Sequence, residues 1–122
     1  MERPEREQIM KVRTDDRPDA VVLGVDGEID GLTAPRLRAA IDAAYEQLDG
    51  RPLVVDLTDV TFLGSPGLQV LLDSAREAVH HRGFETLRIV VDHTRPVVRP
   101  IELTGLDAVL TLFHSVTDAL DG

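Results

Sequence analysis

The chain has 122 residues, 43% hydrophobic and 29% charged, which is the composition of a single globular domain. Its 22 acidic and 13 basic side chains give a net charge of -9, which disfavours nucleic acid and anionic membranes as partners and suits a basic protein surface. The absence of cysteine excludes disulfides, thiol catalysis and cysteine-ligated metals, and no apolar run approaches the roughly 18 residues that span a bilayer.

The first residues have the composition of a tail. Residues 1–7 are charged and include Pro4, which predicts a frayed end, so one domain is expected over residues 8–122. Because the charged N-terminus lacks the apolar core of a signal peptide, neither a leader nor a fused membrane domain is expected. A cytoplasmic protein is therefore expected.

Two strands are predicted near the N-terminus. Gln8–Arg13 can form an edge strand with Ile9, and as a further candidate Val12, reaching the core, and Pro18 predicts a turn over Asp15–Asp19. The β-branched run Ala20–Val25 predicts the second strand.

A helix is predicted after the segment Gly27-Glu28-Ile29-Asp30. Pro35 is a preferred residue of a first helical turn, and Thr33 or Leu32 lies near the cap. Apolar residues then recur every three or four positions and form one face of an amphipathic helix: Leu37, Ala40, Ile41, Ala44, Tyr45 and Leu48. The segment Asp49-Gly50-Arg51-Pro52 ends it.

The stretch that follows is the centre of the predicted fold. Leu53–Leu57 is apolar, rich in β-branched residues and too short for a buried helix, which predicts a central strand covered on both faces. After a short link, Ser65 followed by Pro66 matches a helix N-cap and its first helical residue. Apolar residues then follow at helical spacing, at positions 68, 71, 72, 75 and 79. We expect the Ser65 hydroxyl at the protein surface, at the positive end of the helix dipole.

The last third of the chain predicts further alternation. His80-His81-Arg82-Gly83 is expected to end the helix, and Leu87–Val91 to form another buried strand. A short helix is expected to open at Thr94-Arg95-Pro96, followed by a strand over Ala108–Phe113 and a terminal helix over Ser115–Leu120. The pattern predicts an α/β fold with a mixed, mostly parallel sheet of four or five strands, about four helices and an antiparallel edge near the N-terminus.

The segments Gly27-Glu28-Ile29-Asp30, Thr33-Ala34 and Gly64-Ser65-Pro66-Gly67-Leu68 resemble motifs of the STAS family, the domain of anti-sigma factor antagonists and of sulfate transporter tails. Family members carry Gly-Glu-Leu-Asp…Thr-Ala, then a strand ending in Asp-Leu, a link with an aromatic such as Phe62, and Asp-Ser-Ser-Gly-Leu or Asp-Ser-Thr-Gly-Leu. This chain departs from the second motif in two places, because it has Gly64 for the acid and Pro66 for the second hydroxyl residue.

The resemblance implies a STAS fold and an anti-sigma factor antagonist. In that family the unphosphorylated form binds an anti-sigma factor serine kinase and so releases a sigma factor, and phosphorylation of the first motif serine, here Ser65, switches binding off. The expected partner-binding residues are Glu28, Asp30, Thr33, Gly64, Ser65, Pro66, Gly67 and Gln69. No enzymatic activity, cofactor or metal is expected, and the protein is expected to be a monomer or a weak dimer.

Two alternatives stay open. Because the motif departs from the family pattern at two positions, the chain can instead be a STAS scaffold that binds a partner without a phosphorylation switch. More remotely, Ser65 can be a hydrolase nucleophile with Asp92 and His114, although Leu63 stands where a Gly-x-Ser-x-Gly elbow has its first glycine. On local residues alone, Ser65 is a helix cap with no further role.

Overall fold

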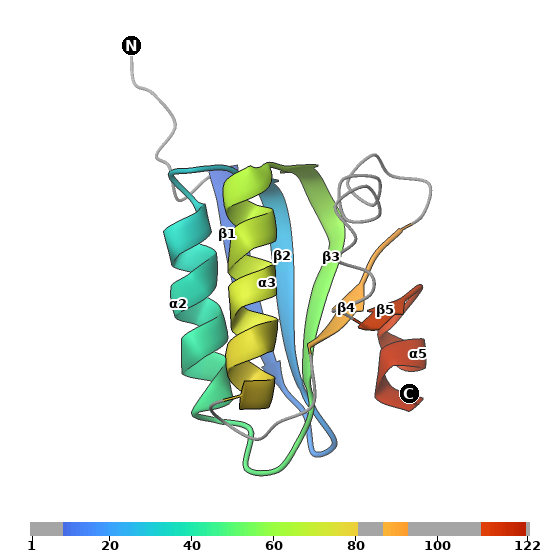
Figure 1. The fold of residues 1–122 in the computed structure, drawn as a ribbon. Coiled ribbons are helices and arrows are strands. Elements are labelled where there is room, and N and C mark those ends of the chain that lie inside the picture. The colour runs from blue at the N-terminus through green and yellow to red at the C-terminus, as the bar shows by residue number, and fades with distance from the viewer. Residues whose placement is uncertain (1–8, 81–86, 93–110, 122) are drawn as a thin grey trace.

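The computed structural model describes residues 9–80, 87–92 and 111–121. Five strands form one sheet in the order β1 (Met10–Asp16), β2 (Val21–Ile29), β3 (Leu53–Leu63), β4 (Arg88–Val90) and β5 (Thr111–Phe113). Helices in the same part of the chain are α2 (Ala34–Tyr45), α3 (Ser65–His80) and α5 (Val116–Asp121). Strand β1 is antiparallel to β2 and all other neighbours are parallel (Figure 1). The predicted mixed sheet with an antiparallel N-terminal edge is therefore confirmed.

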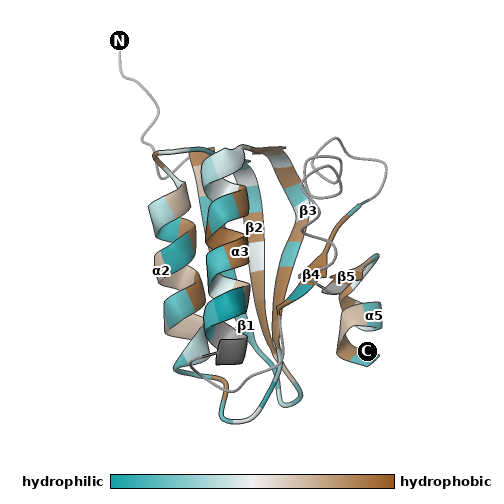
Figure 2. Ribbon diagram, in the orientation of Figure 1, coloured by the Kyte–Doolittle hydropathy of each residue, from teal (hydrophilic) through white to brown (hydrophobic). Residues whose placement is uncertain are grey.

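The helices cover the two faces of the sheet unequally. Helices α2 and α3 lie side by side over one face (Figure 1), and the larger core between them and the sheet includes Leu23 and Val55. The neighbouring residues Val22 and Val54 point to the opposite face, where they form a smaller cluster with Ala119 of α5. Figure 2 shows the distribution of hydropathy that follows from this packing. Most residues of β2 and β3 are hydrophobic, whereas α2 and α3 carry hydrophilic residues on their outer surfaces. The central strand is thus covered on both faces, as predicted.

Strand β1 differs from its prediction at both ends. It runs to Asp16, into the predicted turn, because β2 continues opposite it from Val21 to Gly27 and pairs with all seven of its residues. The core residue at its start is Met10, which is fully buried, whereas Ile9 is only partly buried. The residue predicted to reach the core was therefore wrong by one position. In a strand, neighbouring residues point to opposite faces of the sheet, so this error exchanges the core face and the solvent face.

Strand β3 is longer than predicted, because the expected link before Ser65 is part of the strand. While β2 advances from Gly24 to Asp26, β3 advances from Asp56 to Asp59, and the extra residue forms a bulge. The Asp56 carboxylate stabilises it by accepting hydrogen bonds from the amide (3.0 Å) and the hydroxyl (2.8 Å) of Thr58. A second register shift follows before Leu63. These bulges interrupt the alternation of apolar and polar residues that identifies a strand in a sequence.

Arg51 ties together three segments at the end of the molecule away from Ser65. Its guanidinium donates to the carbonyls of Gln47 and Leu48 just beyond α2, to the carboxylate of Asp16 at the end of β1 and to the carbonyl of Arg17. Arg51 therefore links the turn that follows α2 to the first hairpin.

Several predicted segments lie outside the described residues. These are the tail 1–7, most of the helix stop after His80, the helix expected at Thr94-Arg95-Pro96 and residues 108–110 of the last strand. Strand β4 and helix α5 lie within one or two residues of their predicted bounds. No helix in the described part of the chain is long and apolar enough to cross a membrane.

Ser74 on α3 is fully buried, and its hydroxyl has no hydrogen-bond partner among the described residues, although its backbone carbonyl accepts a bond from Tyr45 Oη at 3.1 Å. Replacing Ser74 with alanine should therefore stabilise the fold by about 1 kcal/mol, since an unpaired buried hydroxyl is removed and alanine favours the helix. Urea unfolding measures this change.

Thr33→Ala is the matched control for that measurement. The Thr33 hydroxyl is equally buried but makes hydrogen bonds to three groups, so its loss should destabilise the fold by about 1–3 kcal/mol. A loss of stability in Ser74→Ala would show that the Ser74 hydroxyl has a partner after all.

Candidate functional site

Ser65 is the first residue of α3, and the residue that caps the helix is Gly64. The Gly64 carbonyl accepts hydrogen bonds from the amides of Gly67 (3.0 Å) and Leu68 (3.1 Å), which is the position of an N-cap. The prediction that Ser65 is the cap was wrong by one residue. It failed because β3 continues to Leu63 and leaves a single residue between strand and helix, a place where glycine is tolerated.

The Ser65 side chain is exposed at this helix terminus, as predicted. Its hydroxyl makes no hydrogen bond with any residue that the structure describes, in contrast to Thr33, Thr58 and Thr61. Pro66 follows in the first helical turn, where its missing N–H would be unpaired in any case. The hydroxyl is therefore free to turn toward solvent or toward a bound protein.

A tightly bonded loop between β2 and α2 lies beside Ser65. The Asp30 carboxylate accepts hydrogen bonds from the amides of Leu32 and Thr33, both at 2.9 Å. The Thr33 hydroxyl accepts from the Asp30 amide (2.8 Å) and donates to the Glu28 carbonyl (2.9 Å). These bonds fix the loop. Thr33 therefore has no free surface for a partner, and its place among the predicted binding residues is that of a support.

The loop and the start of α3 are held together by backbone contacts. The Gly64 amide donates to the Ile29 carbonyl at 3.0 Å, and Gly31 lies next to the ring of Pro66. Gly67 is buried, and a Cβ placed on it would lie 2.6 Å from side-chain atoms of both Ile29 and Leu63. The glycine that the family motif requires thus lets the first turn of α3 lie directly on the ends of β2 and β3.

Replacing Gly67 with alanine should destabilise the protein by about 1–3 kcal/mol, because the added methyl group overpacks a site between two core side chains. The measurement is again urea unfolding, with Gly31→Ala as control. An added Cβ at Gly31 meets one atom, of Pro66, at an ordinary 3.9 Å. Equal stability of the two variants would contradict the close approach of α3 to the sheet.

The predicted binding residues divide into an exposed and a buried group. Glu28, Ser65, Pro66 and Gln69 are exposed, and the Gln69 amide donates to the Asp73 carboxylate one helical turn on, at 2.8 Å. Asp30 and Gly64 are partly buried, and Thr33 and Gly67 are buried. The structure brings these residues together at the end of the molecule where β2 and β3 finish.

Two large apolar side chains at this end were not predicted as binding residues. Leu32 in the β2–α2 loop is 62% exposed, and Phe62 at the end of β3 is 51% exposed. The Phe62 ring lies against Gly64, since a Cβ built there would be 3.1 Å from its Cε2 atom. We name Leu32, Phe62 and Ser65 the serine face. A sequence gives little signal for it, because an isolated apolar residue normally predicts burial.

The hydrolase alternative is not supported by the geometry. Val90 of β4 pairs with Asp56, and Phe113 of β5 pairs with Val90, so Asp92 and His114 lie near the level of Thr58. Ser65 lies seven residues further along, roughly 20 Å at the rise of a strand. Among the described residues, the Ser65 hydroxyl also lacks the hydrogen bond to a histidine that activates a serine nucleophile.

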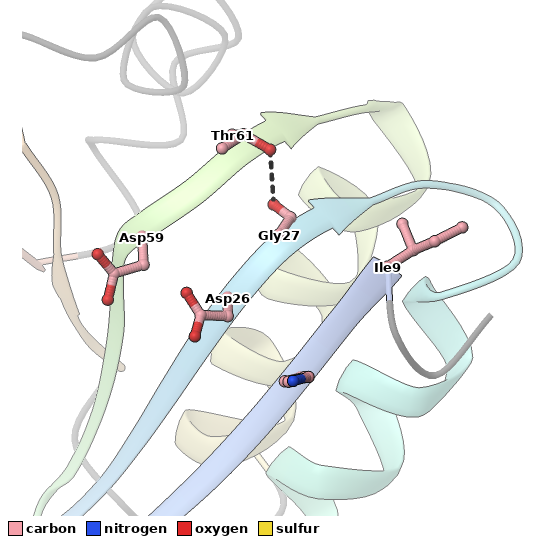
Figure 3. A pocket seen from close by; sticks show the side chains of 6 residues that line it. Ile9, Asp26, Gly27, Asp59 and Thr61 are labelled. Carbon is pink, nitrogen blue, oxygen red and sulfur yellow. Dashed lines mark hydrogen bonds between the residues drawn. The ribbon is translucent and has the colours of Figure 1, made fainter. Parts of the chain in front are cut away.

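A shallow pocket of about 330 Å³ lies on the sheet face opposite α2 and α3 (Figure 3). It is lined by Ile9, Lys11, Asp26, Gly27, Asp59 and Thr61. Asp26 and Asp59 stand on neighbouring strands, and Thr61 donates to the Gly27 carbonyl at 3.3 Å. Two carboxylates make this pocket unsuited to a phosphate or another anion. Within the described residues, no group of three or more His, Asp or Glu side chains is placed to hold a metal ion.

Comparison with known proteins agrees with these motifs. A model of the STAS domain matches residues 11–119. The anti-sigma-F factor antagonist RsfB of Mycobacterium tuberculosis strain H37Rv is 37% identical over 107 residues, which are 88% of this chain and 84% of RsfB. The anti-sigma-B factor antagonist of Listeria monocytogenes is 31% identical over 94 residues, which are 77% of this chain and 79% of that protein.

Solved structures show the same fold. An anti-sigma factor antagonist from Mycobacterium paratuberculosis superposes with a TM-score of 0.80, at 35% identity over 92% of each chain. The Bacillus protein SpoIIAA in its phosphorylated form superposes with a TM-score of 0.60, at 21% identity over 91% of this chain and 97% of SpoIIAA. The two motifs, the sheet that joins them and these matches lead to one conclusion: the chain belongs to the STAS domain family.

Proposed function

We propose that this chain is an anti-sigma factor antagonist of the bacterial cytoplasm that binds an anti-sigma factor serine kinase when Ser65 is unmodified. Phosphorylation of Ser65 releases that partner. The observation that carries the proposal is the exposed, unbonded Ser65 hydroxyl at the start of α3, with Leu32 and Phe62 exposed around it. The relatives in Mycobacterium tuberculosis and Listeria monocytogenes support it, since both are antagonists of anti-sigma factors.

The chemistry asks little of this chain. The Ser65 oxygen attacks the γ-phosphorus of ATP, the bond from that phosphorus to the ADP oxygen breaks, and the serine proton passes to a base. The kinase supplies the base and Mg²⁺, so the substrate needs only a hydroxyl that can enter the cleft in line with the leaving group. The Ser65 side chain, which has no hydrogen bond to the part of the chain that the structure describes, meets that need at no cost in stability.

Other hydroxyl groups on α3 and β3 are poorer phosphate acceptors. Ser74 is fully buried and can be reached only if α3 leaves the core. Thr58 donates its hydroxyl to Asp56, and the carboxylate would repel a phosphate. Thr61 is bonded to Gly27 on the sheet face that carries the acidic pocket. These contacts support Ser65 as the single regulatory acceptor.

The serine face explains why a phosphate at Ser65 switches binding off. Leu32 and Phe62 expose large apolar side chains, which lose their water when a partner protein covers them. A phosphoserine at the same end of the molecule adds about 1.5 to 2 negative charges to a chain that already carries -9. That charge would have to be desolvated in the complex, so the switch needs no refolding of this domain.

Incubation with a cognate anti-sigma factor kinase and ATP tests the proposal, with the product analysed by intact mass and phosphopeptide mapping. One phosphate on Ser65 and none on the Ser65→Ala variant is the expected result. Modification at Thr58 or Thr61 in place of Ser65 would overturn the assignment. Tight binding to the kinase without any phosphate transfer would favour the unswitched scaffold, the function that the departures at Gly64 and Pro66 allow.

A further inference from the structure

Strand β1 is the outer strand of the sheet on the side of α2, and the described part of the chain pairs only with its inner edge. Its sequence is basic in the first half, at Lys11 and Arg13, and acidic in the second, at Asp15 and Asp16. A second copy of this strand, running antiparallel, would place each basic half against an acidic half. We propose that two copies of this chain pair through β1 and form one continuous sheet about a two-fold axis.

The backbone groups at this edge can be assigned from two hydrogen bonds. Gly27 lies opposite Met10, and its carbonyl faces β3, where it accepts a hydrogen bond from the Thr61 hydroxyl (Figure 3). The Met10 carbonyl instead accepts a hydrogen bond from Arg36 Nη1 at 3.0 Å. Met10 and Gly27 are thus a non-hydrogen-bonded pair, in which the N–H and C=O groups of Met10 point to the outer edge of the sheet. Since β1 pairs without a register shift, Val12 and Thr14 also direct these groups to the outer edge.

One register uses all of these features. If Arg13 lies on the two-fold axis, Val12 of one copy faces Thr14 of the other, and their outward N–H and C=O groups bond. All seven residues of β1 then pair. On the solvent side of the sheet, Lys11 faces Asp15 of the second copy, and the symmetry creates this ion pair twice. If the second strand were shifted by two residues in one direction, Lys11 would face Arg13 of the other copy. If it were shifted by two residues in the other direction, Met10 and Lys11 would have no partner within β1 of the other copy.

The direction of the Arg13 side chain limits the repulsion between like charges in this register. Two arginines meet at the axis, but each guanidinium turns along its own sheet toward Asp59, with an Nη2–Oδ2 distance of 3.7 Å. It crosses Gly24 of β2, where a Cβ would lie 2.8 Å from Arg13 Nη2. Each positive charge is thus directed away from the axis and partly compensated within its own chain.

Helix α2 leaves room for a second copy. Its face next to β1 is identified by Arg36, which reaches Met10, and continues with Ala40 and Ala43 at helical spacing. Three residues of strand from Met10 to Arg13 span roughly 10 Å, which corresponds to about seven residues of helix. Ala43 is therefore near the level of the axis, where only small side chains let two helices approach.

The expected dimer is weak and leaves the serine face open. Seven paired residues bury less than a stable interface needs, and two chains of -9 repel each other, so a Kd of roughly 10 µM to 1 mM is expected. An antiparallel pair of β1 strands places the two copies of Ser65 at opposite ends of the joined sheet. This inference does not depend on the proposed function.

Sedimentation velocity from about 10 µM to about 1 mM protein tests the pairing in the full chain. We expect Lys11→Glu and Asp15→Lys each to weaken the dimer at least about tenfold, since each alters both symmetric pairs. The double variant restores opposite charges and should return to within about threefold of the parent. Asp19→Lys, an exposed change of equal charge outside β1, is the matched control and should keep the dimer.

A proline scan tests the backbone assignment. Thr14→Pro removes an outward N–H and should abolish the dimer while the urea midpoint stays near that of the parent. Arg13→Pro removes an N–H that bonds to β2 and should destabilise the monomer itself. A monomer throughout the concentration range would overturn the proposal. So would a dimer that survives Thr14→Pro, or one that the double charge exchange fails to restore.

Discussion

Replacing Ser65 with aspartate should weaken binding to the anti-sigma factor at least about tenfold, a cost of 1.4 kcal/mol or more. Replacing it with alanine should leave binding within about threefold. The reason is that aspartate brings a charge into the serine face, where binding would remove its water, while alanine only removes an exposed hydroxyl. Titration calorimetry with the purified partner measures both.

Neither variant should lose much stability. Gly64 caps α3, so Ser65→Ala removes no capping bond, and urea unfolding should change by less than about 0.5 kcal/mol. Aspartate in the first turn is mildly favoured by the helix dipole. The charge control is Gln47→Glu, which adds one negative charge at an exposed position beyond the far end of α2 and should not affect binding. Wild-type affinity of Ser65→Asp would contradict the electrostatic switch, and failure of Ser65→Ala would give the hydroxyl itself a binding role.

The strands and helices that could be predicted from the sequence are those with an uninterrupted period. The unbroken apolar run Leu53–Leu57 predicted the central strand, which is buried on both faces, and the helical spacing from Leu37 to Leu48 predicted α2, whose buried residues repeat with the helix period. The spacing of residues within one element does not predict which distant segments come together. The family motifs supplied this information, because they indicated that the residues around Asp30 and around Ser65 lie near each other. The bond between Gly64 and Ile29 shows how close they come.

The errors around Ser65 have a common physical cause in β3. Its two register shifts place Thr58, Asp59 and Thr61 within a strand, although their order resembles that of a polar link. The extended strand moves the helix cap from Ser65 to Gly64, and it carries Phe62 to the edge of the site with half of its surface exposed. Such a bulge depends on the partner strand, so it cannot be derived from local residue preferences.

Gly27 is expected to be the position most sensitive to a single added methyl group. Its φ of 97° lies in the left-handed region, and a Cβ would lie 1.9 Å from the Ile9 carbonyl oxygen. That oxygen is part of the backbone at the start of β1 and cannot turn away as a side chain can. Backbone strain of roughly 1–3 kcal/mol and a steric cost of similar size should together lower stability by about 3 kcal/mol or more in Gly27→Ala.

Gly50→Ala separates the two contributions. Gly50 also has a positive φ, 84°, but nothing lies within 4 Å of the position that its Cβ would take. Its replacement should cost only the backbone strain, roughly 1–2 kcal/mol. The difference between the two urea-unfolding free energies therefore measures the contact between Gly27 and the start of β1. Amide exchange in β1 should accelerate in Gly27→Ala and stay unchanged in Gly50→Ala, because only the first pushes β1 from the sheet. Equal losses in the two variants would mean that β1 does not pack on Gly27 at all.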